Sequence, residues 1–211
     1  MAIDAYKLAL DKSGSDDDYC QFQQGICLGL LEKRTEQIDV FESFVTRFVK
    51  SPYRDDAFFE LGNAYMAENM ADEAISTFDK LTIEYPNNGY QARALLNIGL
   101  MYYNSDRNNE AVATYKEVVN LYPGTAAAKE AIAIARKVYI DLGQVNEYAD
   151  WVSGIDFVDI STGSLDSSAY KAAEKVFVTN DYEKSITAFS DYLERYANGF
   201  FALQAHFYRA Q

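Results

Sequence analysis

The side chains that most often carry out chemistry are few in this sequence, and their neighbours do not complete a reactive group. His206 is the single histidine, and no nucleophile or base stands beside it among the nearby aromatic residues. Ser153, in the segment WVSGI, lacks the G-x-S-x-G turn that presents a catalytic serine. No glycine-rich phosphate-binding motif, no H-E-x-x-H and no C-x-x-C occurs. The sequence therefore predicts no catalytic site, no cofactor and a protein that is not an enzyme.

The two cysteines, Cys20 and Cys27, lie in one predicted helix. Their separation of seven residues corresponds to a rise of about 10.5 Å along that helix. A disulfide needs Cα atoms closer than about 7 Å. We therefore expect both cysteines to remain unpaired with each other and to act as small buried apolar residues.

An acidic stretch, DKSGSDDDY at residues 11–19, resembles the start of a calcium-binding loop. Counted from Asp11, however, position six is Asp16 instead of glycine, and position twelve is Phe22 instead of glutamate. The sharp turn and the bidentate ligand are both missing. We interpret the stretch as a turn followed by the acidic N-terminus of a helix, where negative charge is favourable.

The overall charge is strongly acidic, with 19 Lys and Arg against 32 Asp and Glu and a formal net charge of −13. Such a surface repels the phosphates of nucleic acids and of anionic lipids. No segment approaches the roughly 18 consecutive apolar residues of a membrane span. We therefore expect no nucleic-acid partner and no direct membrane insertion.

A repeat with a period of 37 residues organises most of the chain. When the segment that begins at Asp55 is laid over the one that begins at Ala92, the residue types match at one constant offset. The matching residues are Leu61-Gly62 with Ile98-Gly99, Tyr65 with Tyr102, Ala74 with Ala111, Phe78 with Tyr115, Leu81 with Val118, and Tyr85-Pro86 with Tyr122-Pro123. So many matches at one offset indicate copies of one structural unit.

Each unit is predicted to contain two helices joined by a short polar turn. The first helix carries apolar residues at helical spacing, as at Phe58, Leu61 and Tyr65, and the second does so at Phe78 and Leu81. Small residues recur where the two helices must approach closely, and aromatic residues one helical step away fill the wider gaps. These small residues are Gly25, Gly62, Gly99, Ala74 and Ala111.

The motif of a small residue and an aromatic, Gly62 and Tyr65, followed by Ala74, Phe78 and Pro86, resembles the tetratricopeptide repeat. The resemblance implies an all-α fold, a right-handed superhelical solenoid of antiparallel helix pairs. The 37-residue period and the aromatic-proline ending are similar to bacterial cell-envelope members, such as the outer-membrane assembly lipoprotein and the Tol–Pal accessory protein. This narrower resemblance implies a periplasmic or cell-envelope location if the chain is bacterial; a cytoplasmic location stays open.

The expected organisation is a first repeat region over residues 1–152, a break at 153–165, and a second repeat region over 166–211. The first region comprises a half repeat at 2–12 and repeats at about 16–49, 53–86, 89–123 and 125–152. The fourth repeat lacks the alanine of the second helix and the final proline. We interpret 153–165 as a looped crossover, with a short strand that joins a partner as the alternative. The second region holds one further repeat and a terminal half repeat.

The resemblance implies that a partner lies on the face of the first helices that points away from the packing residues. This face is predicted to contain Phe59, Glu60, Asn63, Met66, Arg93, Leu96, Asn97, Leu100, Tyr103, Asn104 and Lys137. Asparagine amides both donate and accept, which suits a peptide backbone. The basic clamp of the family's chaperone-binding members is not matched here. Phe59, Leu96 and Tyr103 have an alternative role, which is to pack against the adjacent repeat.

The sequence thus predicts a scaffold that binds a protein or peptide segment in a groove, within a bacterial envelope complex if the narrower resemblance holds. Two alternatives stay open. One is a structural module that self-associates through its terminal half repeats into a homo-oligomer. The other is a glycan-binding or small-molecule-binding helper domain of a longer chain.

Overall fold

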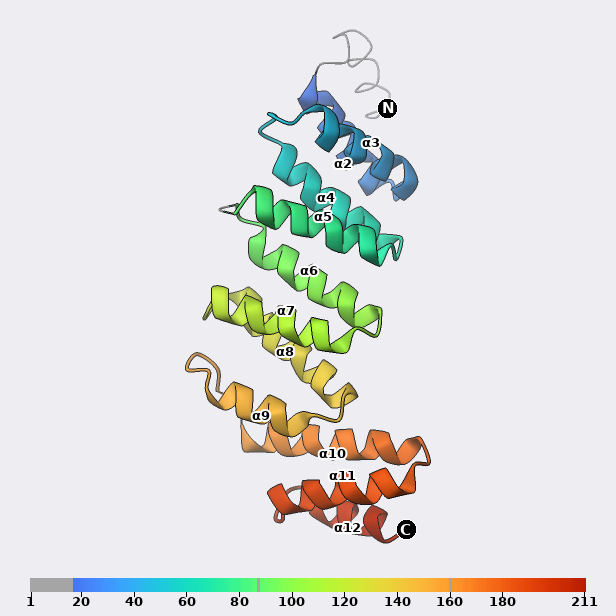
Figure 1. Cartoon of the computed structure of the whole chain (residues 1–211), viewed down its shortest axis with the longest axis vertical. Coiled ribbons are helices and arrows are strands. Elements are labelled where there is room, and N and C mark those ends of the chain that lie inside the picture. The colour runs from blue at the N-terminus through green and yellow to red at the C-terminus, as the bar shows by residue number, and fades with distance from the viewer. Residues whose placement is uncertain (1–16, 87, 160) are drawn as a thin grey trace. The chain divides into compact units, whose positions relative to one another are not determined.

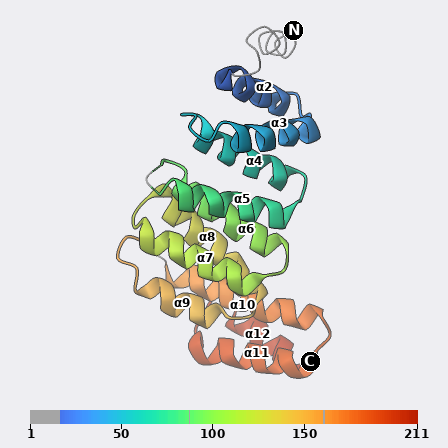
Figure 2. The same cartoon turned by 45° about the horizontal axis from the view of Figure 1, so that its top comes forward.

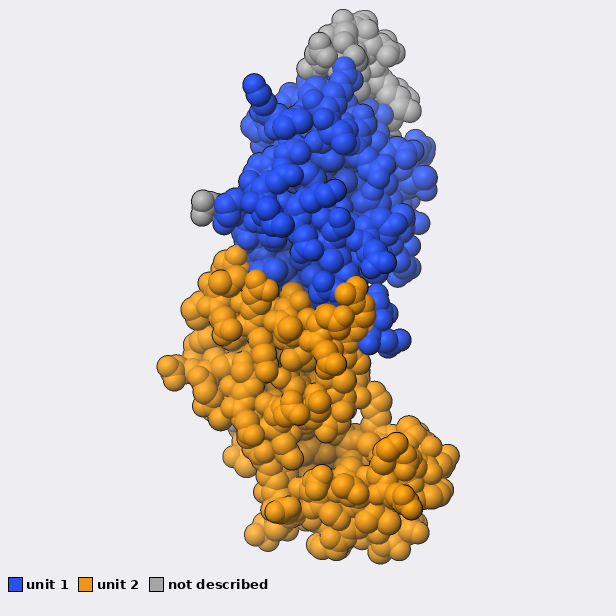
Figure 3. Space-filling view, in the orientation of Figure 1, with its two compact units in different colours: residues 1–106 blue, residues 107–211 orange. Residues whose placement is uncertain are grey.

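The computed structural model describes residues 17–86, 88–159 and 161–211, which form eleven α-helices and no β-strand (Figure 1). These residues belong to two compact units, 1–106 and 107–211, coloured separately in Figure 3. The prediction of an all-α fold is confirmed. The predicted half repeat at 2–12 lies outside the described residues.

Unit 1, residues 1–106, contains five described helices, each of which packs against the next along the chain. They are α2 (Asp18–Leu30), α3 (Arg34–Arg47), α4 (Arg54–Ala67), α5 (Ala71–Glu84) and α6 (Gln91–Asn104). Figure 2 shows these helices one after another in layers. Here α2, α4 and α6 are the first helices of successive repeats, and α3 and α5 are second helices.

Unit 2, residues 107–211, contains six helices. They are α7 (Asn108–Leu121), α8 (Ala126–Asp141), α9 (Val145–Ser153), α10 (Thr162–Val178), α11 (Tyr182–Arg195) and α12 (Ala202–Ala210). Most pack against the next helix in sequence, and α10 packs against both α8 and α9. The residues between α9 and α10 therefore lie within unit 2. The predicted domain boundaries, with a break at 153–165, stay a prediction.

A left-handed backbone residue marks the turn between the two helices of every described repeat. These residues are Glu32, Asn69, Asp106, Gly143 and Asn180, with φ between 57° and 71° and a constant spacing of 37 residues. In the second repeat, Asn69 N donates to Met66 O at 3.1 Å and Met70 N donates to Tyr65 O at 2.9 Å. This pair of bonds satisfies the last carbonyls of the helix. The same bonds recur after α2 and α8, so the turn of the repeat is kept in the fourth repeat despite its altered sequence.

The predicted close approach of small residue and aromatic ring is confirmed within unit 1. A Cβ atom added at Gly25 would lie 2.5 Å from Phe41 Cζ, and one added at Gly62 would lie 2.6 Å from Phe78 Cζ. Both rings are fully buried. The glycines therefore let the ring of the second helix lie directly against the backbone of the first.

The acidic stretch ends in a helix cap. Asp17 accepts a hydrogen bond from Cys20 N at 3.0 Å, and Asp18 lies in the first turn of α2. The bond from this backbone N–H lowers the pKa of Asp17. The interpretation as an acidic helix start is thus confirmed for these two residues, while 11–16 lie outside the described residues. Cys20 and Cys27 both lie in α2 and are unpaired, as expected.

The fourth repeat keeps two helices but alters their contact. Arg136 stands 37 residues after Gly99, where a glycine would be expected, and its side chain bonds Ser168 Oγ at 2.6 Å and Ser164 O at 3.0 Å on α10. Tyr148 takes the place of the small residue on α9 and is fully buried. The second helix is shortened to nine residues, Val145–Ser153.

The segment predicted as a break is a shorter loop than expected. Helix α10 begins at Thr162, because Ser161 caps it by accepting a bond from Ser164 N at 3.3 Å. The described residues between α9 and α10, 154–159 and 161, form no strand within this chain. The alternative of a strand that joins a partner stays a prediction.

We predict that Gly62→Val destabilises the protein by about 1–3 kcal/mol, because the added side chain must displace the buried ring of Phe78. Ala67→Val is the matched control, since Ala67 is exposed on the same helix. Urea unfolding measures both free energies. Equal losses in the two variants would contradict the close packing.

We predict that Glu32→Gly stabilises the protein by about 0.5–1 kcal/mol. A residue with a side chain costs about 1–2 kcal/mol in the left-handed region, and glycine removes that cost in exchange for extra chain entropy. Glu32→Ala keeps the unfavourable backbone and should give no gain. Thermal unfolding of the three proteins measures the difference, and a stabilised alanine variant would show that the backbone is not the cause.

Candidate partner-binding surface

Most of the predicted contact residues lie on two helices of unit 1. Helix α4 carries Phe59, Glu60, Asn63 and Met66, all half-buried. Helix α6 carries the half-buried Leu100 and Tyr103, the exposed Arg93 and Asn104, and the buried Leu96 and Asn97. Lys137 is exposed on α8 of unit 2. We give the name α4–α6 face to the predicted contact residues of these two helices other than Leu96. They are Phe59, Glu60, Asn63, Met66, Arg93, Asn97, Leu100, Tyr103 and Asn104.

Phe59 packs within its own chain. Its ring stacks on that of Tyr90, with ring centres 4.4 Å apart and an angle of 21° between the planes. Tyr90 directly precedes α6, and its hydroxyl donates to Asp56 Oδ1 at 2.5 Å. One face of the Phe59 ring is therefore covered by the next repeat, as the alternative interpretation expected.

The same stack recurs in other repeats. Phe22 stacks on Tyr53 at 5.3 Å, and Tyr170 stacks on Phe201 at 4.5 Å. In each pair the second ring lies 31 residues after the first and directly before the next first helix. In the sequence these stacks correspond to pairs of aromatic residues 31 positions apart, and the pairs recur at multiples of 37 residues. Alignment of the repeats alone did not reveal them. These stacks join one repeat to the next.

Two asparagines join α4 to α6. Asn97 Nδ2 donates to Asn63 Oδ1 at 3.2 Å. Asn97 is 9% exposed, so its amide sits below the surface while Asn63 remains half-buried. The bond uses the acceptor of Asn63 and leaves its Nδ2 group, which can donate to a peptide carbonyl.

Glu60 is a half-buried carboxylate on the same face. Burial raises its pKa, the negative charge of Asp56 raises it further, and Arg34 acts in the opposite direction. No ion pair joins Glu60 to a cation among the residues that the structure describes. A positively charged group brought to this face would therefore relieve an unfavourable charge.

The structure corrects the prediction for Leu96, which is 3% exposed and offers no surface to a partner. The physical reason is the position of α6, in which six consecutive residues, 94–99, are buried. Six residues span more than one helical turn, so the middle of α6 is enclosed on all sides. Helical spacing alone could not show this, because it assumes one exposed face.

The described residues include His206 and the side chains that could bind a metal ion. His206 is exposed, with Nδ1 3.4 Å from Nη2 of Arg209. Within 17–86, 88–159 and 161–211, no group of three His, Cys, Asp or Glu side chains is placed to hold a metal ion. Of the described helices, none has the length and apolar character needed to cross a lipid bilayer.

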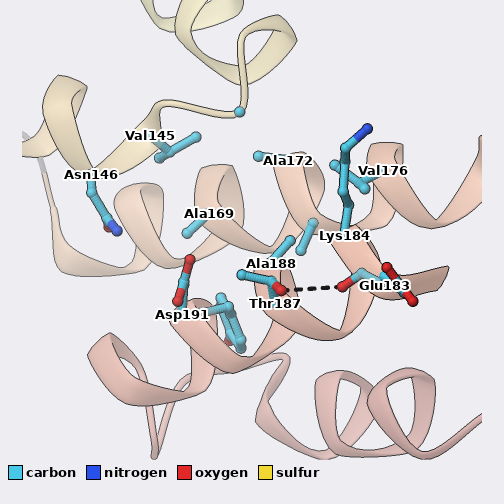
Figure 4. Close-up of a pocket in the computed structure, with 13 residues that line it drawn as sticks. Val145, Asn146, Ala169, Ala172, Val176, Glu183, Lys184, Thr187, Ala188 and Asp191 are labelled. Carbon is cyan, nitrogen blue, oxygen red and sulfur yellow. Dashed lines mark hydrogen bonds between the residues drawn. The ribbon is translucent and has the colours of Figure 1, made fainter. Parts of the chain in front are cut away.

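Unit 2 contains a pocket that the sequence did not predict. It has a volume of about 420 Å³ and lies between the start of α9 and the helices α10 and α11 (Figure 4). Small residues, including Ala169, Ala172 and Ala188, line it, and the charged residues Glu183, Lys184 and Asp191 border it. No sequence motif marks this pocket, because it depends on small residues at positions where other repeats have large apolar residues.

Comparison with known proteins gives the family of part of the chain. The family model described as tetratricopeptide repeat matches residues 56–88 and 93–125. These segments include α4 to α7, whose helices and turns carry the residues of the repeat. These two segments are thus similar to the tetratricopeptide repeat, and no match was found among curated protein sequences.

Solved structures of similar fold extend over most of the chain. MamA is 20% identical, with 85% of this chain and 90% of that chain covered and a TM-score of 0.58. YrrB, described as a tetratricopeptide repeat protein with an unusual peptide-binding site, is 15% identical, with 96% and 97% covered and a TM-score of 0.56. A tetratricopeptide repeat protein from Parabacteroides merdae is 11% identical, with 99% and 91% covered and a TM-score of 0.52. At these identities the likeness shows the fold alone.

We predict that Asp56→Asn lowers the pKa of Tyr90 from about 12 toward its ordinary value of 10. The hydrogen bond to Asp56 is the main cause of the raised pKa, and burial and the negative charge of Asp56 add to it. Absorbance of tyrosinate during alkaline titration, compared with Tyr90→Phe to assign the signal, measures it.

A raised tyrosine pKa stabilises the fold fully below pH 10, and this stabilisation is lost as the pH rises toward 12. Phe59→Leu is the control for the titration, because it removes the stacked ring and keeps the bond to Asp56. A Tyr90 pKa that stays unchanged in Asp56→Asn would contradict the assigned cause.

Proposed function

We propose that the chain is a protein-interaction scaffold that binds a partner segment on the α4–α6 face. Tetratricopeptide repeats generally mediate protein–protein interaction, and scaffolds of this family are generally non-enzymatic. The observation that supports this face is Glu60, a half-buried carboxylate that forms no ion pair among the described residues and has only the more distant Arg34 to offset its charge. That this protein has no catalytic role stays a prediction from the sequence.

The chemistry of the α4–α6 face suits a peptide with a basic side chain. Glu60 supplies a charge-assisted acceptor in partly dehydrated surroundings, where such a bond is strong. Asn63 supplies an amide donor for a backbone carbonyl, and the half-buried Met66 and Leu100 supply apolar contact area. The stack of Phe59 on Tyr90 holds α4 and the start of α6 in place.

Two broader observations agree with this proposal. The acidic net charge of −13 favours approach of a basic partner over long distances. The similar fold of YrrB, a protein described as having an unusual peptide-binding site, is an analogy for peptide binding on this architecture. Action within a periplasmic or cell-envelope assembly stays a prediction from the narrower sequence resemblance.

The proposal predicts that peptides selected from a random display library against the intact protein lose at least about tenfold in affinity for Glu60→Lys. A loss of that size corresponds to about 1.4 kcal/mol, as expected when an attractive charge contact becomes repulsive. Fluorescence anisotropy of the labelled peptides gives the dissociation constants. The selected peptides are expected to be enriched in Lys and Arg.

Glu68→Lys is the matched control, because Glu68 is exposed directly after α4 and outside the face. It makes the same change in net charge, so a loss shared by both variants would indicate only long-range attraction. Selected peptides that bind Glu60→Lys as tightly as the wild type would contradict the proposed face.

A further inference from the structure

The pocket in unit 2 occupies a position that recurs in unit 1 with different side chains. An offset of 111 residues, three periods of 37, relates Phe58, Leu61 and Tyr65 of α4 to Ala169, Ala172 and Val176 of α10. Both sets line hollows beside the second helix of the same repeat, of about 530 Å³ in unit 1 and about 420 Å³ in unit 2. The two hollows are therefore equivalent surfaces of two repeats.

The unit 1 hollow is the larger of the two, and the two hollows also differ in the side chains of the floor. In unit 1 the floor consists of an aromatic ring, a leucine and a tyrosine that bonds Glu42 of α3. In unit 2 the same positions hold Ala169, Ala172 and Val176, and the two alanines extend less far from α10 than Phe58 and Leu61 do from α4. The floor of the unit 2 hollow therefore lies closer to its helix at these two positions than the floor of the unit 1 hollow does.

The charged side chains that line the unit 2 pocket are two carboxylates, Glu183 and Asp191, and one cation, Lys184. Glu183 and Asp191 lie on α11 at the border, and no ion pair joins either to a cation among the described residues. Lys184 is paired with Asp181 at 2.6 Å and Arg195 with Asp150 at 2.9 Å. In the equivalent hollow of unit 1, Lys80 stands where Asp191 stands here.

The spacing of the two carboxylates defines what can fill the pocket. Glu183 and Asp191 are eight residues apart on one helix, a rise of about 12 Å. In an extended segment, residues i, i+2 and i+4 point to one side, and i and i+4 are about 13 Å apart. Two basic residues at i and i+4 thus match the two carboxylates, with residue i+2 over the alanine floor.

The opposite wall can hold the backbone of such a segment. Asn146, at the start of α9, accepts a bond from Arg195 Nη1 at 3.1 Å through its Oδ1 atom. Its Nδ2 group donates to no acceptor among the described residues. An amide donor at this position suits a carbonyl of an extended chain.

We propose that this pocket is a second docking site, which binds an extended partner segment of the form basic-x-large apolar-x-basic. The large apolar side chain enters between Ala172 and Ala188, and the two basic side chains pair with Glu183 and Asp191. Figure 4 shows these residues around one hollow. The site is separate from the α4–α6 face and does not depend on it.

The test uses the whole chain and three synthetic peptides with blocked ends: SKSFSKS, SESFSES and SKSASKS. Isothermal titration calorimetry and ¹H–¹³C methyl spectra of the alanines measure binding. SKSFSKS is expected to bind saturably and to shift the methyl signals of Ala169 and Ala172. SESFSES and SKSASKS are each expected to bind at least about tenfold more weakly.

Two variants locate the site. Ala172→Leu restores the residue found in the second repeat, fills the floor and is expected to abolish binding of SKSFSKS, with Ala113→Leu, at an exposed position, as the control. Asp191→Lys changes an exposed side chain and is expected to weaken binding at least about tenfold, with Asp156→Lys in the exposed loop as the control. Because Asp191 is exposed, this variant remains informative if Ala172→Leu does not fold.

Several results would overturn the proposal. They are no saturable binding of SKSFSKS, equal binding of SESFSES, or binding that persists in Asp191→Lys. Glu60→Lys is expected to leave the shifts of the Ala169 and Ala172 methyl signals by SKSFSKS unchanged. A loss in that variant with none in Asp191→Lys would place the peptide on the α4–α6 face and would reject the second site.

Discussion

The contact between a glycine on the first helix and an aromatic ring on the second determines how the two repeats of α2–α3 and α4–α5 are built. At Gly25 and Gly62 the ring of Phe41 or Phe78 lies where a side chain would otherwise begin. Such contact fixes both the distance and the register of the two helices, since a shift by one residue would bring a side chain into the ring. In the repeat of α10 and α11, Ala173 takes the glycine position against the buried Phe189. The left-handed turn residues then follow at constant spacing, because a fixed register leaves a fixed length of chain to connect.

Where this contact changes, the surface changes with it. The fourth repeat carries Arg136 in place of the glycine, and this side chain bonds α10 instead of admitting a ring. Its second helix is short, and the next repeat has alanines where unit 1 has Phe58 and Leu61. The unit 2 pocket lies at this place, so the site that we propose as a docking surface arises from departures from the repeat pattern. The α4–α6 face, in contrast, belongs to the regular repeats.

Much of the fold follows from the sequence, because apolar spacing and small residues report directly on local packing. The helix pairs, the role of Gly62 and the capping role of Asp17 could all be predicted in this way. The burial of Leu96 could not, because helical spacing does not show how many neighbours enclose a helix. The stack of Phe59 on Tyr90 and the pocket between α9 and α11 also depend on how separate repeats meet, which no single motif contains. Of the predicted binding residues, the structure shows which are accessible, and their binding stays a prediction.

If each repeat of 37 residues packs as one unit, a whole repeat can be removed without breaking the packing of its neighbours. Deletion of residues 54–90 removes α4, α5 and the following turn and joins Tyr53 to Gln91, which keeps an aromatic residue before α6. Deletion of 54–70 removes only α4 and its turn and leaves α5 without its partner. Thermal unfolding followed by circular dichroism at 222 nm compares the two proteins. We predict that the whole-unit deletion stays helical and unfolds cooperatively, whereas the half-unit deletion loses cooperative unfolding. An unfolded whole-unit deletion, or a half-unit deletion that unfolds as cooperatively as the intact chain, would contradict the account.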